Sequence, residues 1–442
     1  MPDPSELEER WPYLTAGVEP VPVLIRRSWD DFRVREIPLH EPTGDGNHVL
    51  LEVEKRGIST AAAVRDLARV LGVRAQDVGV AGLKDTRAVT IQRMSVEHVD
   101  TAAARAVVLP RLRVRDAWRT RRKLRTGQHA GNAFVLTLRA PADDAERDED
   151  AADTRAGEPD IRDRLDDVRG VLAVLSERGI PNYFGAQRFG MRADNHLVGR
   201  ALLRGDFAEA CALIAGRPGP GDTGDLLRAR TLYEQGRYLE AAGAWPRGNA
   251  EAARVARARA QGRDDRGAVL AAGKRLLRFH VSALQSALFN DALALRVDAL
   301  DGIERGDIAW LHRTERVFEV EDPTAASESA RRCEISASGP LFGPRMLEPS
   351  GTPARRERSV LDGAGLTAHD FRATGPWGAP GGRRPLRVPG ISFRAEGGRD
   401  DAGPFLRLEF ALPPGAYATA VLREIAKGRL EVGTARAWEA AR

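Results

Sequence analysis

Strand and helix patterns alternate in the chain up to about residue 140. Ser59 starts an apolar repeat of helical period that ends at Gly72, the order of cap residues expected of a helix. The polar connection 83–88 (LKDTRA) joins two short apolar runs. Runs rich in β-branched and apolar residues predict strands at residues 47–54, 78–82, 89–96 and 133–138. This part of the chain therefore mixes α and β elements.

The pattern changes near residue 184 and changes back near residue 385. Ala- and Arg-rich helical stretches dominate residues 206–290, and Gly, Pro and Arg then crowd residues 339–389. A strand pattern returns at residues 405–412, and a helix is predicted over residues 416–427. The return of the first texture at the end predicts one domain inserted into another.

Composition narrows the class of protein. A chain of 442 residues predicts two domains, and its net charge of +5 permits an anionic partner without demanding one. Two distant cysteines, Cys211 and Cys333, argue against a disulfide framework and a cysteine metal site. The start of the chain lacks a signal-peptide pattern, and no apolar run is long enough to span a bilayer, so we expect a cytoplasmic protein. The acidic stretch 141–167 predicts a solvated loop that leads into a helix.

The first candidate for chemistry is the segment 81–92 (AGLKDTRAVTIQ). An Asp in a polar turn between strands is often only a turn former. Here Lys84 and Arg87 flank Asp85, and nearby cations favour the charged form of a carboxylate. Thr90 and Gln92 lie two apart on the next strand, so they project from the same side and could hydrogen-bond a base or sugar.

The second candidate is a basic run that enters a strand, residues 121–136 (RRKLRTGQHAGNAFVL). Its cations form either a solvated face or a phosphate-contacting edge, and the sequence leaves both open. Asn132 and Phe134 would face one way on a strand, where an amide and a ring could read and stack a base. The cations of the run that would contact RNA are Arg121, Arg122, Lys123 and Arg125.

Two further segments carry candidate residues. Arg188 lies in the Gly-rich stretch 179–190 (GIPNYFGAQRFG), which is either a structured interdomain connection or an RNA-contacting loop. Arg423 falls beside the apolar stripe of the predicted helix 416–427 and, if half-buried, needs an acidic or carbonyl partner. That partner is either Asp85 or another group. Neither GxxxxGK[ST] nor HExxH is present, so the chain lacks the signatures of a P-loop and a zinc protease.

Taken together, these segments resemble the TruD family of tRNA pseudouridine synthases. The matching pieces occur in the family's order, and PNYFGAQRFG and GLKD with its downstream T-x-Q are specific. They are DDFRVREI (30–37), GLKDTRAVTIQ (82–92), RKLRTGQHAGNAF (122–134), PNYFGAQRFG (181–190), SALFN (286–290) and LPPGAYATAVLRE (412–424).

The resemblance implies an α+β fold. A pseudouridine synthase catalytic core, with a mixed, mainly antiparallel sheet and flanking helices, would comprise residues 1–183 and 386–442. An inserted α/β TRUD domain would comprise residues 184–385. Isomerisation of a uridine in tRNA to pseudouridine would follow, at position 13 in bacterial members, with neither metal nor organic cofactor. No obligatory protein partner is implied, and the oligomeric state is left open.

The resemblance also implies roles for individual residues. Asp85 matches the catalytic carboxylate, Phe134 the aromatic beside the flipped base, and Asn132 the active-site amide. Arg423 matches an Arg that pairs with the catalytic Asp in the wider superfamily. The expected substrate-binding residues are Lys84, Gln92, Asn132, Phe134 and Arg423, and the expected RNA contacts are Arg121, Arg122, Lys123, Arg125 and Arg188.

The chain departs from the family pattern in two places, and two other functions compete with that of the enzyme. Bacterial relatives carry a Lys where this chain has Arg26, and because Arg changes the hydrogen-bond geometry, Arg26 is not assigned to the active site. The insertion is also longer than in the compact bacterial form, which leaves the RNA target open. A non-catalytic RNA-binding protein would need the same basic run, but a carboxylate at Asp85 would repel RNA, which favours the enzyme. The third hypothesis is a nucleotide- or metal-dependent enzyme, and this chain lacks every motif that such an enzyme would need.

Overall fold

The chain forms two compact units in a computed structural model that describes residues 10–141, 160–372 and 377–433. One unit, here called the sheet unit, comprises Thr15–Ile180 and Pro389–Arg442. The other, the helical unit, comprises Met1–Leu14 and Pro181–Val388. The acidic stretch predicted as a loop falls largely outside the described residues. Among the described residues, no helix is long and apolar enough to cross a membrane.

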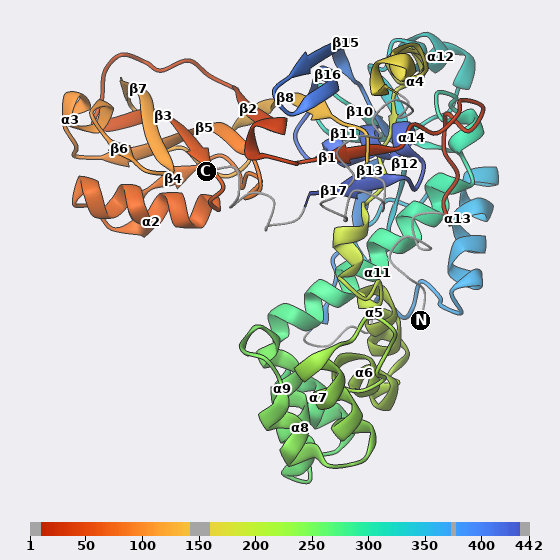
Figure 1. The fold of residues 1–442 in the computed structure, drawn as a ribbon. Coiled ribbons are helices and arrows are strands. Elements are labelled where there is room, and N and C mark those ends of the chain that lie inside the picture. The colour runs from red at the N-terminus through yellow and green to blue at the C-terminus, as the bar shows by residue number, and fades with distance from the viewer. Residues whose placement is uncertain (1–9, 142–159, 373–376, 434–442) are drawn as a thin grey trace, which may run out of the picture. The chain divides into compact units, whose positions relative to one another are not determined.

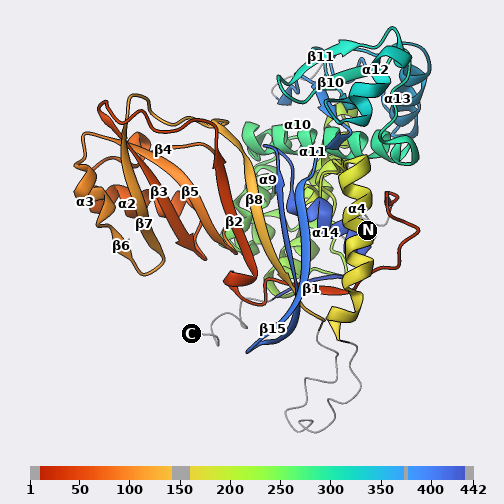
Figure 2. The same cartoon turned by 90° about the horizontal axis from the view of Figure 1, so that it is seen from above.

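The sheet unit is built on a nine-stranded sheet of order β15-β16-β8-β2-β5-β3-β7-β6, with β4 paired to β5 (Figures 1 and 2). Every pair is antiparallel except β2 with β5, so the sheet is mixed and mainly antiparallel, as predicted. Its strands are β2 (Phe32–Pro38), β3 (His48–Arg56), β4 (Gly79–Val80), β5 (Val89–Glu97), β6 (Val108–Leu109), β7 (Leu112–Thr120), β8 (His129–Leu138), β15 (Ile391–Asp400) and β16 (Gly403–Leu412).

One face of strands β3, β5 and β7 packs on helix α2 (Thr60–Leu71). Helix α2 begins as predicted, because the Ser59 hydroxyl accepts a hydrogen bond from the Ala62 amide at 3.1 Å. It ends at Gly72, whose φ of 69° is the left-handed conformation that glycine adopts readily. The buried core of this layer includes Val49, Leu51, Val53, Leu67, Met94, Val96 and Val114. Helix α3 (Thr101–Arg105) packs beside β7.

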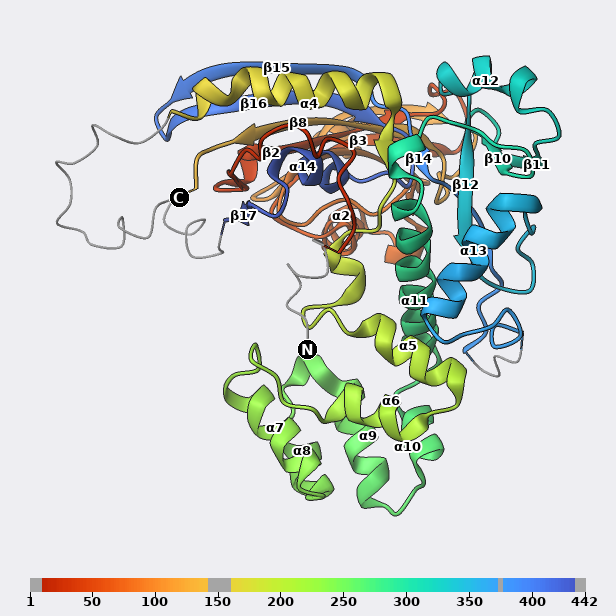
Figure 3. The same ribbon diagram turned by 90° about the vertical axis from the view of Figure 1, so that its right-hand side faces the viewer.

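Helix α4 (Leu165–Arg178) lies along β15 and β16, next to helix α14 (Ala418–Ala426) (Figure 3). A separate parallel pair joins β1 (Val23–Ile25) to β17 (Leu430–Val432), so the two ends of this unit meet. Short 3-10 helices complete the unit at Trp29–Asp31, Ala75–Asp77 and Ile161–Arg164. The predicted strand 405–412 and helix 416–427 are thus confirmed as β16 and α14.

The helical unit contains most of the helices, with a four-stranded antiparallel sheet of order β11-β10-β12-β13. Its helices are α5 (Asn195–Arg204), α6 (Phe207–Ala215), α7 (Gly224–Glu234), α8 (Tyr238–Ala244), α9 (Ala250–Ala260), α10 (Asp265–Ala271), α11 (Lys274–Ala294), α12 (Pro323–Arg331) and α13 (Gly351–Gly363). Its strands are β10 (Ile308–Leu311), β11 (Arg316–Glu319), β12 (Ile335–Leu341) and β13 (Gly382–Pro385). Short 3-10 helices lie at Ala186–Phe189, Arg247–Asn249 and Val297–Ala299, and the connections to the other unit contain β9 (Ile180–Pro181) and β14 (Arg387–Val388).

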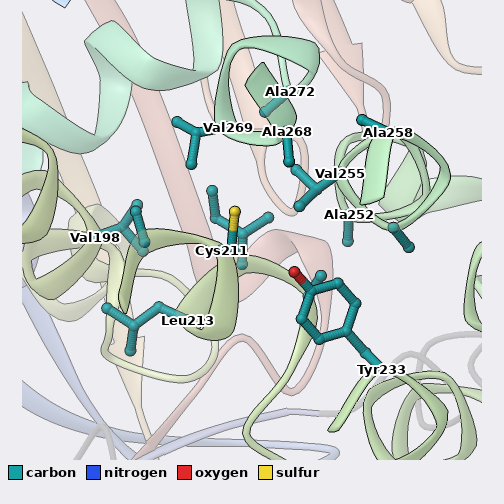
Figure 4. Close-up of a cluster of buried hydrophobic side chains, with 14 of the residues drawn as sticks. Val198, Cys211, Leu213, Tyr233, Ala252, Val255, Ala258, Ala268, Val269 and Ala272 are labelled. Carbon is teal, nitrogen blue, oxygen red and sulfur yellow. The ribbon is translucent and has the colours of Figure 1, made fainter. Parts of the chain in front are cut away.

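Small residues let the helices of this unit approach closely. Ala252, Ala258 and Ala268 are almost fully buried around the side chain of Cys211 (Figure 4). Burial raises the pKa of the Cys211 thiol to about 11, and the carboxylate of Asp265 adds to the effect. Cys211 and Cys333 are both free thiols. Cys211 is therefore a packing residue rather than a reactive one.

The first described residues, up to Leu14, belong to the helical unit. The prediction had assigned them to the catalytic core. Trp11 is 2 % exposed, and its ring stacks on Tyr183 with 6.1 Å between centroids. Its indole nitrogen donates to Asp291 of α11 at 2.8 Å. The prediction missed this because a short segment before Thr15 carries no pattern that says which core it joins.

Candidate active site

Asp85 lies in the connection between β4 and β5, on the sheet unit. Its side chain is 43 % exposed, so the carboxylate is accessible from solvent. Asp85 Oδ1 accepts a hydrogen bond from Arg26 at 3.1 Å, and Oδ2 accepts none from the described residues. One carboxylate oxygen is thus held while the other is open to react.

Arg26 is the cation that holds Asp85, which corrects the expectation that left it out of the site. Its side chain is only 11 % exposed, and the guanidinium lies 4.0 Å from the centroid of the Phe32 ring. The backbone of Arg26 has a φ of 57°, a conformation that costs energy for a residue with a Cβ. Arg26 follows directly on β1. The carbonyl of Ile25, the last residue of β1, accepts a hydrogen bond at 2.9 Å from the amide of Gly433, which follows directly on β17. The pairing of the two ends therefore fixes Arg26 opposite Asp85.

Lys84, Asn132 and Glu36 form a second polar group beside the loop. Lys84 Nζ donates to Asn132 Oδ1 at 2.7 Å and lies 2.9 Å from Glu36 Oε2. Asn132 and Glu36 are directly paired across β8 and β2, which explains how both reach one ammonium. The side chains of Lys84 and Glu36 are 5 % and 2 % exposed. The structure thus joins the two predicted site residues Lys84 and Asn132 directly, and it adds Glu36, a buried acid that was not predicted, as a second partner of Lys84.

Phe134 is buried in a row of aromatic rings. It stacks on Phe410 of β16 with 5.3 Å between centroids and meets Phe32 of β2 edge-on at 6.3 Å. Asn132 and Phe134 do lie two apart on β8, with Leu412 and Phe410 as their partners on β16. Because Phe32 also carries the guanidinium of Arg26, the aromatic row connects the Phe134 ring to the cation at Asp85.

Gln92 is buried rather than open to a substrate. It is 1 % exposed, and its Oε1 accepts from the Thr60 hydroxyl at 3.1 Å. Thr60 in turn accepts from the backbone amide of Lys84 at 3.0 Å. The sequence placed Gln92 and Thr90 on one face of a strand, but β5 is covered on that face by α2. Gln92 therefore supports the loop through Thr60 instead of facing a base.

Lys55 completes the site and was not expected from the sequence. Its side chain is fully buried, and its Nζ donates to the Asp85 carbonyl at 2.7 Å and the Ile58 carbonyl at 2.8 Å. Burial lowers the pKa of Lys55 to about 8; the Asp85 carboxylate acts against this and the Lys84 ammonium adds to it. A signal was present, since Lys55 takes an inward position on β3 in register with Val49, Leu51 and Val53.

The basic run after β7 presents its cations unequally. Arg121 donates to the Asp45 carboxylate from Nε and from Nη2, the latter to Oδ2 at 2.7 Å, and this contact lowers the pKa of Asp45. Lys123 Nζ donates to the Gln76 carbonyl at 2.9 Å. Arg122 and Arg125 are exposed, and neither forms an ion pair with any residue the structure describes. These two are the cations most open to a phosphate.

Arg423 and Arg188 lie elsewhere in their units. Arg423, on α14, is buried and forms an ion pair with Glu424 at 3.4 Å, so the expected pairing with Asp85 is replaced by that of Arg26. Arg188 belongs to the helical unit, where its Nε donates to Ser286 at 3.1 Å and a second nitrogen bonds Ser282. Its guanidinium also lies over Phe279 of the same helix, α11, at 5.3 Å. Arg188 is thus held to α11.

No three His, Cys, Asp or Glu side chains among the described residues gather as metal ligands would. The chemistry that the site offers is that of one open carboxylate beside buried cations. Such a carboxylate can act as a nucleophile or as a general base.

Known proteins share this sequence and fold. The family described as tRNA pseudouridine synthase D (TruD) matches residues 11–425. A tRNA pseudouridine synthase D of Geobacter metallireducens is 41% identical over 419 residues, which cover 94% of this chain and 98% of that protein. One from Geobacter sulfurreducens is 40% identical over 419 residues, covering 94% and 96%. The crystal structure of a putative tRNA pseudouridine synthase D (TruD) from Methanosarcina mazei has a TM-score of 0.80 at 27% identity, covering 97% of this chain and 99% of that one.

Proposed function

Because the chain belongs to the TruD family of tRNA pseudouridine synthases, we propose that it isomerises a uridine of tRNA to pseudouridine with Asp85 as the catalytic carboxylate. One observation carries the assignment to Asp85. Its carboxylate is 43 % exposed, yet one oxygen is fixed by the buried Arg26. An exposed turn-forming Asp needs no buried cation, whereas a reacting carboxylate needs an orientation.

The reaction requires a group of this kind. The bond between C1′ and N1 of the uridine breaks, the uracil rotates, and a bond between C1′ and C5 forms. N1 gains a proton and C5 loses one, so the isomerisation balances without a redox partner. Asp85 Oδ2 either adds covalently to the nucleotide or removes the C2′ proton to give a glycal, and both routes use this single carboxylate.

The surrounding residues are proposed to receive a base that has left its stack. Asn132 and Lys84 would hydrogen-bond its polar edge, and the packed ring of Phe134 would limit its position. Gln92 would act indirectly, because its contact is with Thr60. Arg423 would support helix α14 through Glu424, whose carboxylate also accepts from the Thr15 amide at 2.9 Å.

The RNA contacts are proposed to spread over both units. Arg122 and Arg125 would neutralise phosphates, with Arg121 and Lys123 contributing less because each already has a protein partner. Arg188 would contact RNA from the helical unit. We propose the sheet unit as the catalytic core, the helical unit as the inserted TRUD domain, position 13 of tRNA as the target and the cytoplasm as the location.

Mapping pseudouridines in total RNA, by chemical labelling, tests the proposal in cells. Cells without this protein should lose one tRNA pseudouridine, and the wild-type protein should restore it while Asp85→Asn should not. Loss at a position other than 13 would correct the target and keep the enzyme. Restoration by Asp85→Asn would show that another group is the catalyst.

A further inference from the structure

Lys55 occupies a place where the fold alone favours an apolar residue. On β3, alternate side chains from Val49 onward face α2, and Lys55 is fully buried at the end of that row. Taking an ammonium out of water is costly, and the lowered pKa of Lys55 reflects that cost. An apolar side chain would fill the same position without it. What a lysine adds is the hydrogen bond to the Asp85 carbonyl at 2.7 Å.

Thr60 holds the same loop from a second point. Its hydroxyl is the acceptor for the Lys84 amide at 3.0 Å, and it is itself oriented by donating to Gln92 at 3.1 Å. Lys55 and Thr60 come from one short segment, since Lys55 is the last residue but one of β3 and Thr60 begins α2. Lys55 Nζ also donates to the Ile58 carbonyl at 2.8 Å, which ties this segment to itself.

The two contacts enclose the backbone that carries the carboxylate. Between the Lys84 nitrogen and the Asp85 carbonyl lie the φ and ψ angles of both residues, so fixing the two ends restricts all four. The same segment reaches the end of the loop as well, because the Gly57 amide donates to the Ala88 carbonyl at 3.2 Å. Leu83 of the loop adds little packing, because it is 82% exposed.

We propose that Lys55 and Thr60 are positioning residues for the isomerisation, which together clamp the backbone at Asp85. The inference rests on the proposed function of Asp85. During the reaction the uracil detaches and turns, so the base cannot keep the carboxylate in place. The clamp supplies that placement from the protein side, and Arg26 fixes the carboxylate itself.

The test compares variants of the full chain on one tRNA transcript. Lys55→Met removes the ammonium with similar volume, and Thr60→Val removes the hydroxyl with similar shape. Thr60→Ser is the matched control that keeps the hydroxyl. Lys427→Met is a second control, because Lys427 Nζ also donates to a backbone carbonyl, that of Glu424, at 2.6 Å. Single-turnover rate, tRNA Kd and thermal unfolding are measured for each.

The clamp predicts that Lys55→Met and Thr60→Val lower the single-turnover rate by roughly a hundredfold while tRNA Kd is unchanged. Thr60→Ser and Lys427→Met should keep the wild-type rate. A wild-type rate in Lys55→Met would overturn the proposal for Lys55. If Lys55→Met does not fold, the comparison of Thr60→Val with Thr60→Ser tests the clamp. Equal rates for these two variants would overturn the proposal. Asp85→Asn runs alongside: activity there contradicts the proposed function, whereas an inactive Asp85→Asn beside a fully active Lys55→Met contradicts only the clamp.

Discussion

Arg26 shows how much of this site depends on single residues. It is the sole ion-pair partner of Asp85 among the described residues, and its guanidinium is sandwiched between that carboxylate and the Phe32 ring. The sequence alone did not assign Arg26 to the site, because the family resemblance implies a Lys at this position. Arg26 makes a single contact to Asp85, at 3.1 Å to Oδ1, and a lysine ammonium could make a contact of the same kind.

Arg26→Met should therefore reduce the single-turnover rate by about a hundredfold or more, because the carboxylate loses its fixed cation. Arg26→Lys should retain most of the rate, since an ammonium keeps the charge and can make a single contact to Asp85 Oδ1 of the kind that Arg26 makes. Rates are measured with excess enzyme on one tRNA, and circular dichroism checks the fold. Equal rates for Met and Lys at this position would show that the charge does not orient Asp85.

Lys55 should make the stability of the protein depend on pH. Its folded pKa is about 8, whereas the pKa of a lysine in an unfolded chain is about 10.4. Below about pH 8 both states carry the proton and the burial cost is fully present. Between the two values only the unfolded state carries it, so stability rises with pH. Each pKa unit of separation contributes about 1.4 kcal/mol.

Chemical unfolding of the wild type and of Lys55→Met between pH 7 and pH 10 checks this linkage. The difference in unfolding free energy should move in favour of the wild type as the pH rises, because Met has no proton to lose. Titrating groups that do not interact with Lys55 cancel in the difference. A constant difference across this range would mean that Lys55 is not held at a lowered pKa.

Among the elements, β7 is a strand that the sequence pattern did not predict. Strand β7 alternates buried Leu112, Val114 and Ala117 with exposed Arg113 and Arg115. The high density of Arg made the segment look like a purely basic run, so no strand was expected there. By contrast α2, β3, β5, β8, β16 and α14 were predicted within a few residues, because each has its own apolar period and end signals.

The loop after β7 makes a prediction about RNA binding. Arg122→Gln with Arg125→Gln should weaken tRNA binding and reduce the slope of log affinity against log salt by about 2. Arg121→Gln should have a smaller effect, because Asp45 already neutralises that guanidinium. Filter binding at several salt concentrations measures both. A larger effect of Arg121→Gln would show that Arg121 contacts a phosphate in spite of its ion pair with Asp45.

For the whole molecule, the sequence pattern indicated an insertion, and the structure contains two compact units with three crossings of the chain between them. The sequence predicted changes near residues 184 and 385, and in the structure the chain passes from one unit to the other after Ile180 and after Val388. The third, after Leu14, was not predicted, since Trp11 joins its core through contacts with Tyr183 and Asp291 that are distant in sequence. The same limit applies to the site. Asp85, Asn132 and Lys84 were predicted from local motifs, whereas Arg26, Glu36 and Lys55 reach the loop only through sheet pairing and helix packing.

The catalytic role of Asp85 is tested by measuring pseudouridine formation on one tRNA transcript, with excess enzyme, by purified wild-type protein and by Asp85→Asn. The wild type should convert a single uridine, and Asp85→Asn should convert none while binding the transcript with similar Kd. Conversion by Asp85→Asn at the wild-type rate would rule out Asp85 as the catalytic group, because the carboxylate would then play no part in the chemistry.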